Sequence, residues 1–159
     1  MRFSYMLLGL ALVGCQATPE VFDVPGPQSY DRDRAEVWPG VVGAIEAKGL
    51  SIVEANAASG RLSATLVDYQ PKGWAACKRV RVVDRQDDKS RRGRGRPDGR
   101  QLKLNVQVDE GGSGSIVRLA AAFSERQINP FRNLPLRNRI PCQSTGQLER
   151  DLFGAIGRG

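Results

Sequence analysis

Residues 101–109 constrain the fold most, because apolar and polar side chains alternate along them without a break. The apolar positions are Leu102, Leu104, Val106 and Val108. Successive side chains of a strand point to opposite sides of a sheet, so this alternation predicts a strand with one buried and one exposed face. Residues 115–125 alternate in the same way after the glycine-rich segment 111–114. Two such strands predict an antiparallel sheet that is covered on one side only.

Three further strands are predicted upstream from shorter runs of the same kind. Residues 50–55 and 61–69 flank a turn, and residues 78–86 place Val80 and Val82 on one face with arginines on the other. The sheet is therefore expected to have five strands.

A helix is predicted before the strands. Asp31 or Asp33 can cap it, and apolar residues at helical spacing extend it to about Lys48. Pro39 lies inside this pattern, and an interior proline removes a hydrogen bond. The helix is therefore either kinked at Pro39 or regular only from there.

A second helix is predicted at the end of the chain. Ser144 and Gln147 resemble a capping box, and an apolar stripe follows as far as Ile156. The predicted order is helix, five strands, helix. Because the sheet has one apolar face, we expect an α+β fold with a five-stranded antiparallel sheet and two helices packed on one face.

The first residues of the chain have the composition of an export signal. Arg2 precedes an apolar run, residues 3–15, that is shorter than the roughly 20 residues needed to cross a bilayer. Its end, Leu12-Val13-Gly14-Cys15, resembles the lipobox of bacterial lipoproteins. The resemblance implies that residues 1–14 are removed and that Cys15 is acylated. The alternative is an ordinary signal peptide or a buried apolar helix, in which Cys15 carries no lipid.

The lipobox interpretation divides the chain into three parts. They are a signal peptide over residues 1–14, a lipid-anchored tether over residues 15–29 and a single domain over residues 30–159. Gln16 stands where inner-membrane retention in enteric bacteria usually shows Asp, which implies sorting to the outer membrane. We therefore expect a lipid-anchored protein on the periplasmic face of the bacterial outer membrane.

The chain is basic, with 24 Lys and Arg, 17 Asp and Glu and a formal net charge of +7. A basic exported domain is suited to anionic partners such as lipopolysaccharide, phospholipid headgroups, peptidoglycan carboxylates or an acidic protein. Nucleic acid is not expected, because export separates the protein from it and the arginines are not interleaved with aromatic residues.

The cysteines favour a structural role. With Cys15 assigned to lipid, Cys77 and Cys142 remain as an even pair in an oxidising setting, and a disulfide between them is predicted. The alternative is two free buried thiols. The chain contains no histidine, so Cys/His and Ser/His/Asp nucleophile arrangements are impossible. We expect a non-enzymatic protein that needs no cofactor and no metal.

A dense basic segment lies between the third and fourth predicted strands. It contains Lys89, Arg91, Arg92, Arg94, Arg96 and Arg100, separated by glycine and proline. We expect a flexible loop here. Arginine forks bind phosphate and carboxylate groups well. The predicted contacts for an anionic ligand are Arg91, Arg92, Arg94 and Arg96. The alternative is a solvated hairpin tip that neighbouring aspartates partly neutralise.

A second basic group occurs in residues 126–143, which contain three prolines and are expected to form a loop over the surface. Arg132, Arg137 and Arg139 lie there beside apolar residues such as Phe131. Arginine with exposed apolar side chains is frequent at protein interfaces, so these arginines are candidate contacts for a partner. The alternative is that the apolar side chains pin the loop to the sheet edge.

The predicted elements also follow a known order. A helix with Trp38, a strand ending near Glu54 and then Leu62-Ser63-Ala64-Thr65 stand behind the lipobox and a proline-bearing tether. Over residues 30–156 this arrangement resembles the helix-grip domains of BamC-like outer-membrane lipoproteins. The resemblance implies a non-enzymatic interaction or assembly-accessory domain with an envelope protein as partner. A second function stays open: binding of an anionic lipid or glycan through the arginine-rich loop.

Overall fold

The computed structural model describes residues 21–69, 73–86 and 89–158 of the chain. Its strands are β1 (Gln28–Tyr30), β2 (Ser51–Asn56), β3 (Arg61–Val67), β4 (Ala75–Ala76), β5 (Arg81–Gln86), β6 (Lys89–Arg94), β7 (Arg96–Gly111), β8 (Gly114–Ile128) and β9 (Ile140–Ser144). Its helices are α1 (Arg34–Ala47) and α2 (Gln147–Ile156). Residues 1–14, predicted to be a signal peptide, and Cys15 lie outside the described residues.

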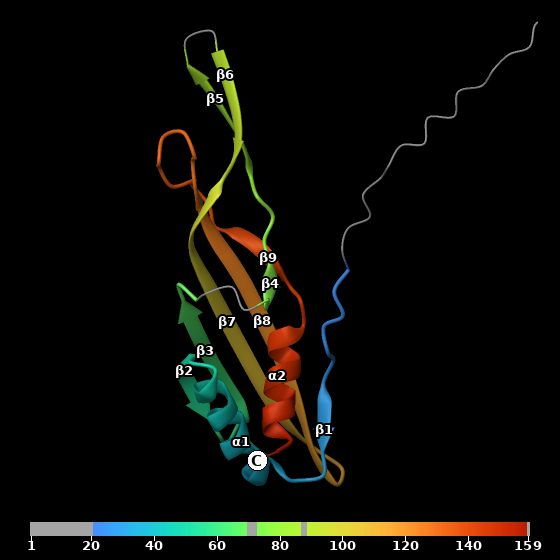
Figure 1. Cartoon of the computed structure of the whole chain (residues 1–159). Coiled ribbons are helices and arrows are strands. Elements are labelled where there is room, and N and C mark those ends of the chain that lie inside the picture. Colours follow the sequence, from blue (N-terminus) through green and yellow to red (C-terminus); the bar gives the residue numbers. More distant parts are fainter. Residues whose placement is uncertain (1–20, 70–72, 87–88, 159) are drawn as a thin grey trace, which may run out of the picture.

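β7 and β8 form a long antiparallel hairpin at the centre of the main sheet (Figure 1). Their register runs from Arg96 opposite Ile128 to Gly111 opposite Gly114. β3 and then β2 continue the sheet beyond β7, while β9 and then β4 continue it beyond β8. β1 also pairs with β8, near the β7–β8 turn. In the described residues this makes a seven-stranded sheet, and β5 and β6 form a separate two-stranded sheet.

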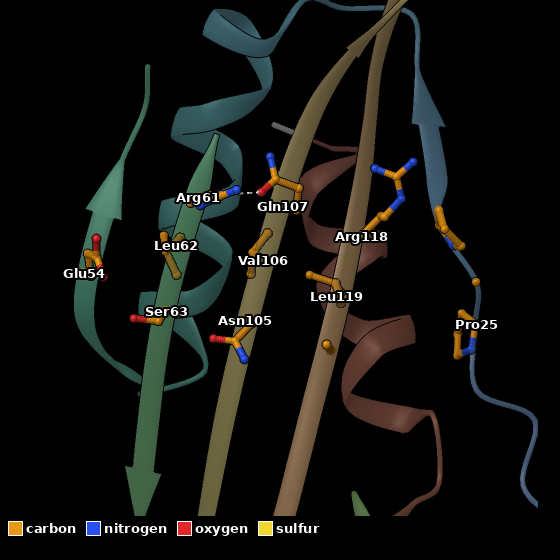
Figure 2. A pocket seen from close by; sticks show the side chains of 13 residues that line it. Pro25, Glu54, Arg61, Leu62, Ser63, Asn105, Val106, Gln107, Arg118 and Leu119 are labelled. Atoms are coloured by element: carbon orange, nitrogen blue, oxygen red, sulfur yellow. Dashed lines mark hydrogen bonds between the residues drawn. The ribbon is translucent and has the colours of Figure 1, made fainter. Parts of the chain in front are cut away.

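The two helices share one core with the apolar face of the main sheet. From the helices this core takes Val37, Val41, Ile45, Leu148, Leu152 and Ile156, and from β7 and β8 it takes Leu102, Leu104, Val106, Val108, Val117 and Phe123. Each large apolar side chain contributes about 1.5–3 kcal/mol when fully buried. Figure 2 looks onto the opposite face of the sheet, with both helices behind the strands. The alternation of β7 thus predicted its buried side chains correctly.

The helix starts agree only in part with the predicted caps. The Asp33 carboxylate accepts a hydrogen bond from the Glu36 backbone N–H at 2.9 Å and caps α1. α1 continues through Pro39, so its regular part does not begin there. α2 instead begins after Gly146, which has a φ of 77° and makes no side-chain cap bond. The Ser144 hydroxyl accepts from the Gly146 N–H at 3.1 Å, so the predicted capping box is not formed.

The predicted order of helix, five strands and helix is wrong, and so is the five-stranded sheet. The chain is α+β with two helices in its described part, but seven strands form the main sheet and two more form the second one. Residues 89–100, predicted to be a loop, form β6 and the start of β7, and residues 126–143 include the end of β8 and most of β9. β1, β4 and β9 have 3, 2 and 5 residues, which is too short for a clear period of two.

An ion pair joins the end of α1 to α2. Lys48 Nζ lies 2.7 Å from Asp151 Oδ2, and Gln147 Nε2 donates to Oδ1 at 2.7 Å. The hydrogen bond from Lys48 is the main cause that holds the pKa of Asp151 below its usual value of 3.8. A carboxylate with a lowered folded pKa stabilises the fold above its unfolded pKa, and this contribution is lost as the pH falls through the folded pKa.

We predict that Asp151→Asn lowers the free energy of unfolding by no more than about 1 kcal/mol at pH 7, because the pair is partly exposed. The difference from the wild type should shrink as the pH falls below about 4. Urea unfolding at a series of pH values measures both effects. Lys48→Met is the matched control, and the double variant should lose no more than either single one. A loss that is independent of pH would contradict the assigned role of this pair.

Candidate functional site

The hairpin of β5 and β6, which we call the arm, is separate from the main sheet. Its strands pair antiparallel from Arg81 opposite Arg94 to Gln86 opposite Lys89. Figure 1 shows the arm projecting beyond the main sheet, at the end opposite α1. The arm therefore displays its side chains away from the core.

One face of the arm is covered by the segment that follows β8. Val82 and Asp84 on this face are 8% and 6% exposed. Phe131 lies so close to Gly93 that a Cβ at this glycine would be 2.8 Å from the phenyl ring. Arg132 forms an ion pair with Asp84 at 2.5 Å. Side chains of the 129–137 segment thus neutralise and bury this side of the arm.

The opposite face carries arginine and is open. Because cross-strand neighbours share a face, the register gathers there Arg81, Val83, Arg85, Ser90, Arg92 and Arg94. All six are exposed, and Val83 retains 54% of its accessible area. Within the described residues, none of the four guanidinium groups forms an ion pair or a side-chain hydrogen bond. We call Arg81, Arg85, Arg92 and Arg94 with Val83 the arginine face.

A buried polar network holds the base of the arm. The Gln127 side chain, fully buried on β8, accepts from the Val80 N–H at 3.0 Å and donates to the Lys78 carbonyl at 2.9 Å. Val80 itself accepts from the Gly95 N–H at 2.8 Å. The chain thus enters the arm at Val80 and leaves it at Gly95, and a hydrogen bond joins these two points. The entering segment is also bonded to Gln127 of β8.

Glu125 is the charged centre of this network and is fully buried. Its carboxylate accepts from Arg100 Nε at 2.8 Å and from Gln127 Nε2 at 2.9 Å, and Arg79 lies 3.6 Å away. Burial raises the pKa of the neighbouring Tyr69. The positive charge of Arg100 lowers this pKa and the negative charge of Glu125 raises it, but burial is the largest effect. The Tyr69 hydroxyl therefore stays neutral beside the ion pair.

The Cys77–Cys142 disulfide is confirmed and lies next to the same network. It links two residues 65 positions apart, with their Cα atoms 4.4 Å from each other. Cys77 precedes the arm and Cys142 lies on β9, opposite Phe123 of β8. The disulfide thus joins the chain that leads into the arm to the main sheet.

The predicted arginine contacts do not form one group. Arg92 and Arg94 lie on the arginine face, whereas Arg91 lies opposite Asp84 on the covered face. Arg96 Nη2 donates to the Asn133 side chain at 2.7 Å. All four side chains are exposed, but only Arg92 and Arg94 lie together on the arginine face.

The second basic group is divided in the same way. Arg132 is paired with Asp84, and Arg139 donates to the Ser124 hydroxyl at 3.1 Å. Arg137 is exposed, outside the arginine face. Arg81 and Arg85 were not proposed as contacts. The alternation of arginine and valine in residues 79–83 was visible, but only the β5–β6 register shows that these side chains join Arg92 and Arg94.

A second candidate surface is a groove on the helix-free face of the main sheet (Figure 2). It has a volume of about 640 Å³, with Glu54 on one side and residues 25–27 on the other. Polar and small side chains of β3, β7 and β8 form its floor: Arg61, Ser63, Asn105, Gln107, Arg118 and Ala120. Arg118 is paired with Asp109. Leu62, Val106 and Leu119 also line the groove, so its surface is mixed polar and apolar and only weakly basic.

The edge of β8 beside this groove is incomplete. β1 pairs with residues 115–117 of β8 and β9 pairs with residues 123–125. Among the described residues, 118–122 therefore pair with β7 on one side only. An extended peptide is the kind of ligand that such an edge can accept.

The described residues contain no group of three or more His, Cys, Asp or Glu side chains arranged to hold a metal ion. In this part of the chain no helix has the length and apolar character needed to span a bilayer.

Neither a protein-family model nor a curated protein matches this chain. The likeness to BamC-like domains and the lipobox therefore stay predictions from the sequence.

We predict that Glu125→Ala lowers the free energy of unfolding by about 3 kcal/mol, because Arg100 and Gln127 would stay buried without their partner. Glu110→Ala is the matched control, since Glu110 pairs with Arg34 but is 69% exposed. Its loss should stay within about 1 kcal/mol. Denaturant unfolding measures both. Equal losses in the two variants would show that the buried network does not stabilise the fold more than a surface pair does.

Proposed function

We propose that the chain is a lipid-anchored, periplasm-facing lipoprotein of the bacterial outer membrane whose domain is a non-enzymatic interaction module. The apolar run and the residues Leu12-Val13-Gly14-Cys15 support the anchor. The Cys77–Cys142 disulfide supports export to an oxidising compartment. The absence of histidine from the sequence supports a binding role over nucleophilic catalysis.

The arginine face is the observation that carries the proposal. Arg81 stands directly opposite Arg94, and like charges at opposed positions of a sheet destabilise it. No ion pair within the described residues offsets this repulsion. Each guanidinium offers several donors suited to phosphate and carboxylate oxygens. The arrangement is therefore unfavourable for the isolated fold and favourable for binding an external anion. We infer that the module recognises an anionic component of the envelope.

The groove supports a second contact, with a partner protein. The unpaired residues 118–122 of β8 and the mixed polar and apolar floor suit an extended peptide segment. Such a contact corresponds to the assembly-accessory role that the resemblance to BamC-like domains implies. The arm and the groove involve different residues, so the two contacts can be tested separately.

We predict that changing Arg81, Arg85, Arg92 and Arg94 together to Gln weakens binding to anionic envelope components at least about tenfold, or 1.4 kcal/mol. The probes are lipopolysaccharide, phosphatidylglycerol vesicles and peptidoglycan fragments, each at two ionic strengths. Binding by the wild type should weaken with salt, because exposed charges are screened beyond about 10 Å at 0.1 M.

The control for this experiment removes the same number of exposed cations outside the arm and the groove, with Gln at Lys103, Arg126, Arg150 and Arg158. It should change affinity by less than about threefold, and thermal melting should show both variants folded. If the two quadruple variants bind alike, the arginine face is not the site, and the groove becomes the remaining candidate surface.

We predict that Cys15→Ser removes the protein from the membrane fraction after a high-salt wash, because the acyl chains provide the stable anchoring. Fractionation and mass spectrometry of the processed N-terminus measure the outcome. A Cys77→Ser, Cys142→Ser variant is the control for cysteine loss and should keep its lipid. Retention of Cys15→Ser at the wild-type level after the wash would overturn the lipobox assignment.

A further inference from the structure

We infer that the arginine face docks on the phosphate headgroups of the membrane that carries the chain's own lipid anchor. This inference rests on the proposed function and names the anion that the arm recognises. Three observations lead to it: the extent of the face, the apolar residue at its centre and the course of the N-terminal segment.

The arginine face is too long for one small anion. Arg81 and Arg85 are four residues apart on β5, which separates them by roughly 13 Å along the strand. Arg92 and Arg94 lie on the neighbouring strand, about 5 Å away. A single phosphate contacts one or two of these groups. A surface that presents many phosphates can contact all four, and anionic phospholipid headgroups form such a surface.

Val83 at the centre favours a lipid surface over a purely polar polymer. It is 54% exposed, with Arg92 directly opposite and Arg81 and Arg85 two residues away on the same strand. Arginine side chains extend their charged ends to the headgroups while apolar neighbours face the interface. A fully hydrated glycan would give the exposed valine no comparable environment.

The N-terminal segment leaves the fold toward the arm. The Asp23 carbonyl accepts a hydrogen bond from Arg150 Nη1 at 2.9 Å, so the chain there lies beside the start of α2. β9, which precedes α2, pairs with residues 123–125 of β8, near the end from which the arm projects. Figure 1 shows residues 21–27 running in this direction from β1.

The length of the tether fits the same membrane. Cys15 precedes Val21 by six residues, which can span at most about 20 Å. The β5–β6 arm is itself about 20 Å long, at roughly 3.3 Å per residue. An acyl group at Cys15 therefore keeps the membrane surface within about 20 Å of Val21, a distance similar to the length of the arm. Anchor and arm together would supply the two signals that hold a protein stably and in one orientation.

The test places an environment-sensitive label either on the arm or on the main sheet. Val83→Cys puts the fluorophore NBD on the arginine face, and Val53→Cys puts it on β2, where the valine is 71% exposed. Labelling without reductant preserves the Cys77–Cys142 disulfide, and melting verifies the fold. The full acylated protein is reconstituted in vesicles of phosphatidylcholine alone and of equal parts phosphatidylcholine and phosphatidylglycerol.

The label at Val83 should shift to shorter wavelength only in the vesicles with phosphatidylglycerol. The shift should disappear in high salt and when Arg81, Arg85, Arg92 and Arg94 are Gln, while the label at Val53 stays unchanged. No shift at Val83, or equal shifts at both positions, would overturn the inference. If Val83 gives no shift but the arginine face still binds peptidoglycan fragments, the proposed function stands and only membrane docking fails. If the arginine face binds none of the probes, both fail.

Discussion

β7 and β8 are paired over their whole length, and the other parts of the fold are attached to this hairpin. Both helices pack on the apolar face that their alternating side chains create. β3 joins the free edge of β7, and β9 and β1 join that of β8. Only Gly95 separates β6 from β7, so the arm continues directly from the hairpin. Anything that disturbs this pairing would displace the core and the candidate contact surface together.

The same hairpin shows why part of the fold could be predicted. From Leu102 to Val108 buried residues alternate with exposed or partly exposed ones, and the apolar and polar residues of the sequence follow the same period of two. The sequence of β6 shows no such alternation. Gly93 stands where the arm meets Phe131, and Arg92 and Arg94 occupy the open face. A strand without apolar residues on either face is recognised only from its partner strand, which a local pattern does not contain.

The candidate site was predictable in composition but not in arrangement. Arg91 and Arg92 are adjacent and look alike in the sequence, yet the β5–β6 register places them on opposite faces. Whether an arginine is available depends on residues far along the chain, as the pairing of Arg132 with Asp84 shows. Half of the arginine face also comes from β5, whose arginines are spaced too widely to form a cluster in the sequence. The sequence alone showed that arginines are concentrated in this region. The fold was needed to show which of them are unpaired and share one open face.

The prolines beside the incomplete edge of β8 have a consequence for the protein in a crowded setting. Residues 118–122 of β8 would offer free backbone groups to any passing strand, which is a common route to aggregation. Pro25 and Pro27 line the groove next to them, and proline has no N–H with which to extend a ladder. The segment that precedes β1 can therefore lie along this edge without becoming a strand. The two prolines thereby limit which strands can be added at this edge and disfavour sheet-to-sheet association between copies of the chain.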